Sequence, residues 1–184
     1  DGAREYGNEI VDDVVDDAST RRGVETVHSR FNYRVAVLAG DFLFAQASWH
    51  LANLDNLDVV KLLSRVIMDL ADGEVKQGLF RFDTGQSFET YFEKSYCKTA
   101  SLIANSAKAA GVLSDLSDPQ LESLYHYGRQ LGLAFQVVDD ILDFTGSDQQ
   151  LGKPAASDLS SGYLTAPALY ALEERPALSG LIER

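Results

Sequence analysis

Two aspartate clusters of the same form, D-D-x-x-D, are the residues of this chain best suited to chemistry. The six carboxylates, three in the first cluster and three in the second, are Asp12, Asp13, Asp16, Asp139, Asp140 and Asp143. Residues three and four apart on a helix share a face, so each cluster places two carboxylates side by side. Such carboxylates repel one another, and Mg²⁺ is the natural compensating ion for hard oxygen ligands. We therefore predict that all six aspartates bind Mg²⁺ and bridge the protein to a phosphate ligand.

The surroundings of the second cluster strengthen this interpretation. Apolar residues precede it from Leu131 to Val138, and Ile141 and Leu142 lie within it. A charged triplet on a helix that faces a core is costly unless the charges are paired or bound to metal. A single D-D-x-x-D motif would be explained as well by a solvated acidic helix face. Two copies in one chain favour a metal site.

Composition indicates an ordinary globular protein, and the aspartate clusters indicate that it binds a small anion through metal. The chain has 184 residues, of which 45% are apolar and 24% are charged. Its net charge of −12 argues against nucleic acid as a partner, because binding to the phosphate backbone needs clustered Lys and Arg. Divalent ions resolve the conflict between an acidic protein and a phosphate ligand, since carboxylates hold the ions and the ions hold the phosphate.

A few basic residues lie close to the clusters in sequence. Arg21 and Arg22 follow the first cluster, and Lys153 follows the second in a Gly-Lys-Pro segment. Lys98, next to Thr99, lies between the two clusters. Planar guanidinium groups bind phosphate oxygens through paired hydrogen bonds. Each of these residues alone would be read as a solvated surface charge, but their proximity to the clusters makes them candidate phosphate ligands.

The sequence predicts a bundle of long helices. Proline is absent from the first 118 residues, and neither alternating strand patterns nor internal repeats are evident. The predicted helices cover residues 1–18, 31–52, 57–79, 87–111, 118–146 and a last segment from about 165. The segment 31–52 is apolar almost all round and is predicted to be buried. Its most apolar part, Val35 to Trp49, contains Asp41 and is judged too short to cross a bilayer, so we expect a soluble protein without a transmembrane segment.

Several of these motifs together resemble the trans-isoprenyl diphosphate synthases. The matching segments are D-D-V-V-D-D-A-S-T-R-R-G at 12–23, Gly40-Asp41, Glu74 to Gln77, Lys98-Thr99, F-Q-V-V-D-D-I-L-D at 135–143 and G-K-P at 152–154. The segment 158–174 is most similar to the long-chain, solanesyl-type branch of cyanobacteria and plastids. The resemblance extends over nearly the whole chain.

This resemblance implies an all-α fold of the isoprenoid synthase type, with long helices around a central cavity. Residues 1–184 would form a single polyprenyl synthase domain that is incomplete at both ends. The implied activity is condensation of isopentenyl diphosphate with an allylic diphosphate, either farnesyl or geranylgeranyl diphosphate, to give a long-chain polyprenyl diphosphate. Mg²⁺ is the implied cofactor, with Mn²⁺ as the alternative. A homodimer is implied, located in a plastid or in the cytoplasm.

The resemblance also implies roles for individual residues. Six positions would contact the substrates' diphosphate groups: Arg21, Arg22, Lys98, Thr99, Gln136 and Lys153. Gly7 and Asn8, one helical turn before the first cluster, would leave the cavity open for a long product. Two positions depart from the family pattern, since Val11 stands where His is usual and Tyr163 where a phosphate-binding Lys is common.

Three alternatives remain at this point. A class I terpene cyclase shares the fold, but its second metal motif normally mixes other residue types over a wider spacing. A non-catalytic regulatory subunit of a prenyl synthase usually loses the aspartates, whereas this chain keeps all six. A simple acidic bundle that binds Mg²⁺ or Ca²⁺ explains the carboxylates but neither the Arg21-Arg22 pair nor the Gly-Lys-Pro segment.

Overall fold

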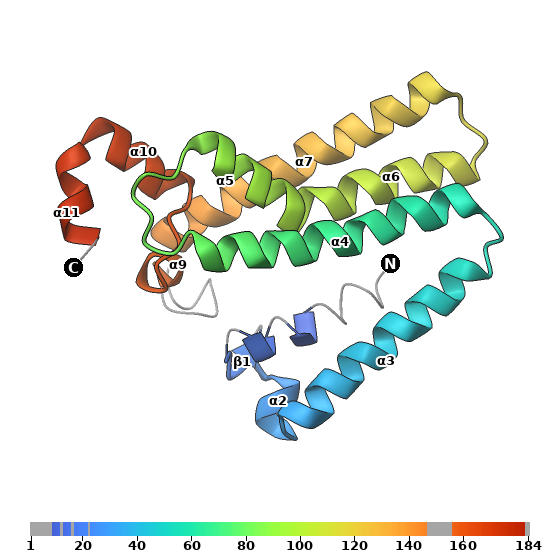
Figure 1. The fold of residues 1–184 in the computed structure, drawn as a ribbon, viewed down its shortest axis with the longest axis horizontal. Helices are drawn as coiled ribbons and strands as arrows, with labels where there is room; N and C mark the ends of the chain where they lie inside the picture. Colours follow the sequence, from blue (N-terminus) through green and yellow to red (C-terminus); the bar gives the residue numbers. More distant parts are fainter. Residues whose placement is uncertain (1–8, 12, 16, 22, 147–155, 183–184) are drawn as a thin grey trace. The chain divides into compact units, whose positions relative to one another are not determined.

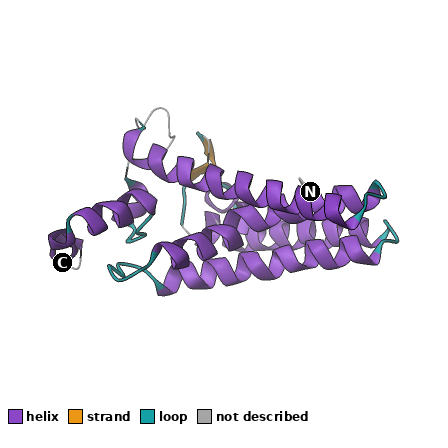
Figure 2. Cartoon of the chain, turned by 90° about the horizontal axis from the view of Figure 1, so that it is seen from above, coloured by secondary structure: helices purple, strands orange, loops and turns teal. Residues whose placement is uncertain are grey.

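The computed structural model describes residues 9–11, 13–15, 17–21, 23–146 and 156–182. Within these ranges the elements are helices, apart from two strands of two residues each (Figure 2). The predicted all-α class is therefore confirmed. The chain divides into two compact units, Asp1–Val60 and Lys61–Arg184, which are described separately below.

The first unit begins with helical residues at 9–11 and 13–15, as predicted for the first cluster. The helix is followed by a hairpin that the sequence reading did not foresee. Strands β1 (Thr20–Arg21) and β2 (Val24–Glu25) pair antiparallel, and Gly23 takes a left-handed φ of 77° in the turn between them. The hydroxyl of Thr26 donates to the main-chain oxygen of Ala18 at 2.7 Å and closes the base of this hairpin.

Helix α2 (Val27–Arg30) leads into α3 (Tyr33–Ala52), where the side chain of Asn32 caps the first turn. The predicted helix at 31–52 is thus confirmed, but the prediction that it is buried is wrong. Its only buried residues are Ala36, Gly40 and Leu51, all within the described part of the chain. The larger apolar side chains on it that are exposed include Val37, Leu38, Phe42 and Trp49. An apolar composition on all faces allows a helix to be buried. Burial itself also requires other elements that pack against each face.

The length of α3 also corrects the membrane argument. The helix has 20 residues, more than the apolar stretch from Val35 to Trp49, and by length and composition alone it could cross a membrane. Core helices of soluble proteins can be equally long and apolar, so one such helix is weak evidence for a membrane span.

The second unit contains most of α4 (Leu57–Leu79), whose bounds match the prediction. The predicted helix from Ser87 to Gly111 is a continuous helical segment with three parts: α5 (Phe88–Ser95), the π-helix η1 (Tyr96–Ala100) and α6 (Ser101–Leu113). The side chain of Ser87 accepts a hydrogen bond from the amide of Thr90 and caps α5, as expected from its residue type. The π-helix was not predicted.

Helix α7 (Asp118–Thr145) carries the second cluster. Ser117 and Gln120 form a capping box at its start, and Gly146 caps its end. Figure 1 shows α6 and α7 side by side, joined by a short loop. Gly128 and Gly132 permit close packing, because an added Cβ atom would lie 2.8 Å from the Cα of Ala104 in α6 at Gly128 and 2.5 Å from the Cα of Ala100 in η1 at Gly132. The close contact brings η1 against the middle of α7.

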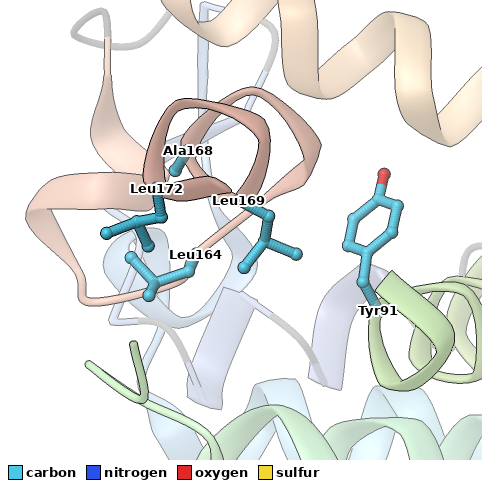
Figure 3. Close-up of a cluster of buried hydrophobic side chains, with 5 residues drawn as sticks. All are labelled: Tyr91, Leu164, Ala168, Leu169 and Leu172. Carbon is cyan, nitrogen blue, oxygen red and sulfur yellow. The ribbon is translucent and has the colours of Figure 1, made fainter. Parts of the chain in front are cut away.

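The C-terminal part of the unit folds back with α9 (Ser157–Ser160), α10 (Ala166–Glu174), the 3₁₀ helix η2 (Pro176–Leu178) and α11 (Ser179–Ile182). The predicted start of the last helix near Thr165 is correct, and Thr165 is the residue that precedes it. The buried side chains shown in Figure 3 form a cluster of five: Tyr91, Leu164, Ala168, Leu169 and Leu172. We call this the tyrosine–leucine cluster. It packs α10 against α5.

Candidate functional site

The three aspartates of the second cluster have different environments. Asp139 is exposed, whereas Asp140 and Asp143 are each only 1% exposed. Asp140 and Asp143 lie three residues apart, so they share a helical face, as predicted, and that face is turned inward. Asp139 is therefore the one carboxylate of this cluster that is directed towards solvent.

The buried carboxylate of Asp140 is held by neutral hydrogen-bond donors. The hydroxyl of Tyr91 donates to one of its oxygens at 2.6 Å, and the side-chain amide of Gln136 donates to the other at 2.8 Å. Burial raises the pKa of Asp140, while these bonds and a backbone hydrogen bond from Ala166 act in the opposite direction. The sequence argument considered charge pairing or metal for these buried aspartates, and it did not consider neutral hydrogen-bond donors.

Asp143 holds the start of α9. One of its carboxylate oxygens accepts from the hydroxyl of Ser157 at 3.0 Å, and the other accepts from the amide of Asp158 at 3.3 Å. Its main-chain oxygen accepts from the amide of Ala156 at 2.8 Å. Asp143 therefore ties the start of α9 to the end of α7.

Two of the predicted phosphate ligands, Thr99 and Gln136, are linked to Asp140, and a third, Lys98, is next to Thr99 in the chain. Thr99, in η1, donates to the side-chain oxygen of Gln136 at 2.6 Å, so that Thr99, Gln136 and Asp140 form a continuous chain of hydrogen bonds. Lys98 forms an ion pair with Glu74 at 3.0 Å and a hydrogen bond with Gln77 at 3.1 Å, both on α4. π-Helical turns within α-helices are frequent at functional sites, and this one carries Lys98 and Thr99.

Two residues of this region were missed by the sequence reading. Tyr91 donates to Asp140 as described above, and Lys94 lies one turn before Lys98 and is only 7% exposed. Burial lowers the pKa of Lys94, and the negative charges of Asp140 and Asp158 partly oppose this change. The spacing of four residues between Lys94 and Lys98 was the available signal, because it places both on one helical face. For Tyr91 the sequence offered none.

The first cluster is represented among the described residues by Asp13, which is 5% exposed. Arg21 of the hairpin donates from Nε to its carboxylate at 2.8 Å, and a second guanidinium nitrogen lies 3.8 Å from Glu9. A guanidinium has five N–H donors, so these two contacts do not use them all. Arg21 is therefore close to the first cluster, as the sequence predicted.

The remaining predicted site residues lie outside the described ranges: Gly7, Asn8, Asp12, Asp16, Arg22 and Lys153. Their roles stay predictions. Within the ranges that are described, no group of three or more His, Cys, Asp or Glu side chains is arranged to hold a metal ion. The donors nevertheless fit Mg²⁺, because Asp139 offers an exposed hard oxygen ligand and Mg²⁺ usually takes one or two carboxylates, substrate phosphates and water.

Comparison with known proteins supports the resemblance. The family model for polyprenyl synthetase matches residues 10–184. A prenyl transferase of Synechocystis sp. is 68% identical over 175 residues, which are 95% of this chain and 54% of that protein. The chloroplastic solanesyl diphosphate synthase 2 of Arabidopsis thaliana is 58% identical over 174 residues, which are 95% of this chain and 42% of that protein.

Solved structures agree. A heptaprenyl diphosphate synthase from Staphylococcus aureus has a TM-score of 0.96 and is 32% identical. The matched region covers 100% of this chain and 57% of the synthase chain. A polyprenyl synthase from Caulobacter crescentus, complexed with calcium and isoprenyl diphosphate, has a TM-score of 0.91 and 35% identity, covering 99% and 57%. The chain belongs to the polyprenyl synthetase family. It spans about half the length of the curated relatives it matches.

Proposed function

We propose that the protein containing this chain is a trans-polyprenyl diphosphate synthase that condenses isopentenyl diphosphate with an allylic diphosphate. The observation that carries the proposal is the arrangement on α7. It combines an outward-facing carboxylate, Asp139, with Gln136 and Thr99, two predicted phosphate ligands, linked by hydrogen bonds one turn away. Relatives named as prenyl transferases and solanesyl diphosphate synthases support the same activity.

In the proposed reaction the carbon–oxygen bond of the allylic diphosphate breaks, and its electron pair leaves with the diphosphate. The double bond of isopentenyl diphosphate attacks the resulting allylic cation, and loss of a proton gives a product five carbons longer. Mg²⁺, when bound, neutralises the diphosphate and makes it a better leaving group. Asp139 in the second cluster and the aspartates of the first cluster would each be ligands for such an ion, with Mn²⁺ as the alternative.

The residues of this chain would bind and orient the substrate. Gln136 lies one turn before Asp139 on α7, and Lys98 lies in η1 next to Thr99. The N–H groups of both side chains are suited to diphosphate oxygens. Asp140 and Asp143, whose oxygens already accept hydrogen bonds from the protein, would hold α7 to α5 and α9 rather than meet the ion. This refines the prediction that all six aspartates bind metal.

The finer assignments rest on the resemblance and on the relatives' names. We propose farnesyl or geranylgeranyl diphosphate as the allylic substrate, a long-chain product of the solanesyl type and a homodimer. The plant relatives named chloroplastic favour a plastid location, and the Synechocystis relative favours the cytoplasm of a cyanobacterium.

The test is to incubate the full-length protein with Mg²⁺, labelled isopentenyl diphosphate and each allylic diphosphate in turn. A synthase incorporates the label into a long-chain product that mass spectrometry identifies, and a chelator abolishes the reaction. A terpene cyclase would consume the allylic substrate without incorporating label. A regulatory subunit or a simple metal-binding bundle would leave both substrates unchanged.

A further inference from the structure

Tyr91 connects α5 to the second cluster. It lies 49 residues before Asp140, is 1% exposed, and its hydroxyl donates to the Asp140 carboxylate at 2.6 Å. None of the metal or phosphate ligands predicted from the sequence includes it. A tyrosine with a fully buried ring that directs its one polar atom at a buried carboxylate has a defined task, because burying either group without a partner would be costly.

The ring of Tyr91 is fixed by its packing. It belongs to the tyrosine–leucine cluster, and Figure 3 shows it beside Leu169 with its hydroxyl directed away from α5. Phe88 and Phe92, on the same helix, meet it edge-on, at ring-centroid distances of 6.4 and 5.2 Å. The apolar body thus sets the direction of the polar tip. Tyr91 presents a donor whose position does not depend on the ligand.

The bond from Tyr91 continues into the predicted phosphate ligands. A carboxylate only accepts hydrogen bonds, so Gln136 must direct its amide nitrogen at Asp140. Its oxygen then faces Thr99, which donates to it at 2.6 Å. The order Tyr91, Asp140, Gln136 and Thr99 therefore sets which way the amide of Gln136 points, and that amide is a candidate donor to diphosphate.

We propose that Tyr91 is a positioning residue of the diphosphate site, acting through Asp140 to orient Gln136 and to hold Asp139 in place on α7. The inference rests on the proposed function, since it concerns the same site. Without the hydroxyl, one oxygen of Asp140 loses its donor, and the carboxylate is free to rotate away from Gln136. The amide of Gln136 then becomes ordered only when diphosphate binds. The conformational entropy lost in that step weakens binding.

The test compares Tyr91→Phe with Tyr125→Phe in the full-length protein. Tyr125 is a matched control, because its hydroxyl also makes one short hydrogen bond, to Tyr96 at 2.7 Å, and lies far along α7 from the aspartates. The readout is binding of inorganic pyrophosphate in the presence of Mg²⁺, measured by calorimetry, together with the Tm of the metal-free protein. We expect Tyr91→Phe to bind about tenfold more weakly, and Tyr125→Phe to bind like the wild type.

A double-mutant cycle separates positioning from general destabilisation. In an Asp140→Ala background Tyr91 has lost the group it acts on, so Tyr91→Phe should change pyrophosphate binding by less than about twofold. An independent tenfold loss in that background would overturn the proposal, as would wild-type affinity in Tyr91→Phe itself.

Two unnatural residues cover the case in which Tyr91→Phe does not fold. At Tyr91, 4-aminophenylalanine retains a donor and should bind pyrophosphate like the wild type, whereas 4-methylphenylalanine fills the same space without one and should bind about tenfold more weakly. Equal binding by the two would overturn the inference. If the wild type itself neither binds pyrophosphate with Mg²⁺ nor extends an allylic primer, the proposed function fails instead.

Discussion

The two aspartate clusters satisfy a buried carboxylate in opposite ways. In the first, Asp13 is paired with a cation, Arg21, from a hairpin eight residues further along the chain. In the second, Asp140 accepts hydrogen bonds from the neutral side chains of Tyr91 and Gln136. The second aspartate of each motif, Asp13 or Asp140, is buried, and so is the third aspartate of the second motif, Asp143. Equal motifs therefore do not imply equal environments.

The comparison bears on what each cluster can offer a ligand. An arginine that pairs with an aspartate can also bind diphosphate, so the first cluster holds cation and carboxylate in one local unit. In the second cluster, neutral side chains donate hydrogen bonds to both buried carboxylates: Tyr91 and Gln136 to Asp140, and Ser157 to Asp143. The first arrangement depends on a short loop, and the second on the packing of α5, α7 and α9.

The largest effect is expected from Asp139→Ala in the full-length protein. Asp139 is exposed, so the fold should survive, while turnover of the allylic substrate should fall roughly a hundredfold or more, because a ligand to the ion is lost. Steady-state assays over a range of Mg²⁺ concentrations, with circular dichroism for the fold, measure this. Normal turnover in Asp139→Ala would refute its assignment as the metal-facing carboxylate of the second cluster.

A smaller effect is expected where the first cluster loses its cation. Arg21→Ala leaves the buried Asp13 without its main partner and should destabilise the hairpin by about 1 to 2 kcal/mol, less than a fully buried pair because Arg21 is partly exposed. Hydrogen exchange of peptides from residues 17–30 reports this locally. Arg30→Ala is the control, since that exposed side chain lies over the ring of Phe31. Equal protection in the two variants would show that Asp13 does not depend on Arg21.

A neutral donor to the second cluster should matter less. Ser157→Ala removes one hydrogen bond to Asp143, which keeps its bond from the amide of Asp158, and we expect a loss of about 1 kcal/mol. Ser160→Ala is the control, because that exposed hydroxyl donates to a main-chain oxygen within α9. Thermal unfolding of the full-length variants compares them. A larger loss in Ser160→Ala than in Ser157→Ala would contradict the proposed tie between α7 and α9.

The smallest effect concerns pH. Because burial raises the pKa of Asp140, the folded metal-free protein binds this proton more tightly than the unfolded chain does. The stabilisation that comes from protonated Asp140 is complete below the pKa of this residue in the unfolded chain. It is lost as the pH rises through the pKa of Asp140 in the folded protein. Asp140→Asn does not titrate, so its stability relative to the wild type should increase from about pH 4 towards neutrality. Urea unfolding at several pH values measures this difference, and a decrease over that interval would show that the pKa is lowered instead.

Local features of the sequence determined much of the fold. The bounds of α4, the cap at Ser87, the capping region of α7 and the start of α10 were all visible in residue types and spacing, because caps and helical periodicity act over a few residues. The short contact between Asp13 and Arg21 was similarly within reach, since the two residues lie eight apart. The family, too, followed from motifs that are continuous in the chain.

Tertiary structure decided the rest. Three features depend on tertiary packing, which the hydrophobic periodicity of the sequence does not show. They are the exposure of α3, the π-helical turn at Tyr96–Ala100 and the hairpin. The pairing of Tyr91 with Asp140 spans 49 residues and depends on the packing of α5 against α7. A sequence shows that a carboxylate is set among apolar residues. Only the fold determines whether metal, a cation or a phenol satisfies it, because that choice depends on atoms within about 3 Å, which come from distant parts of the chain.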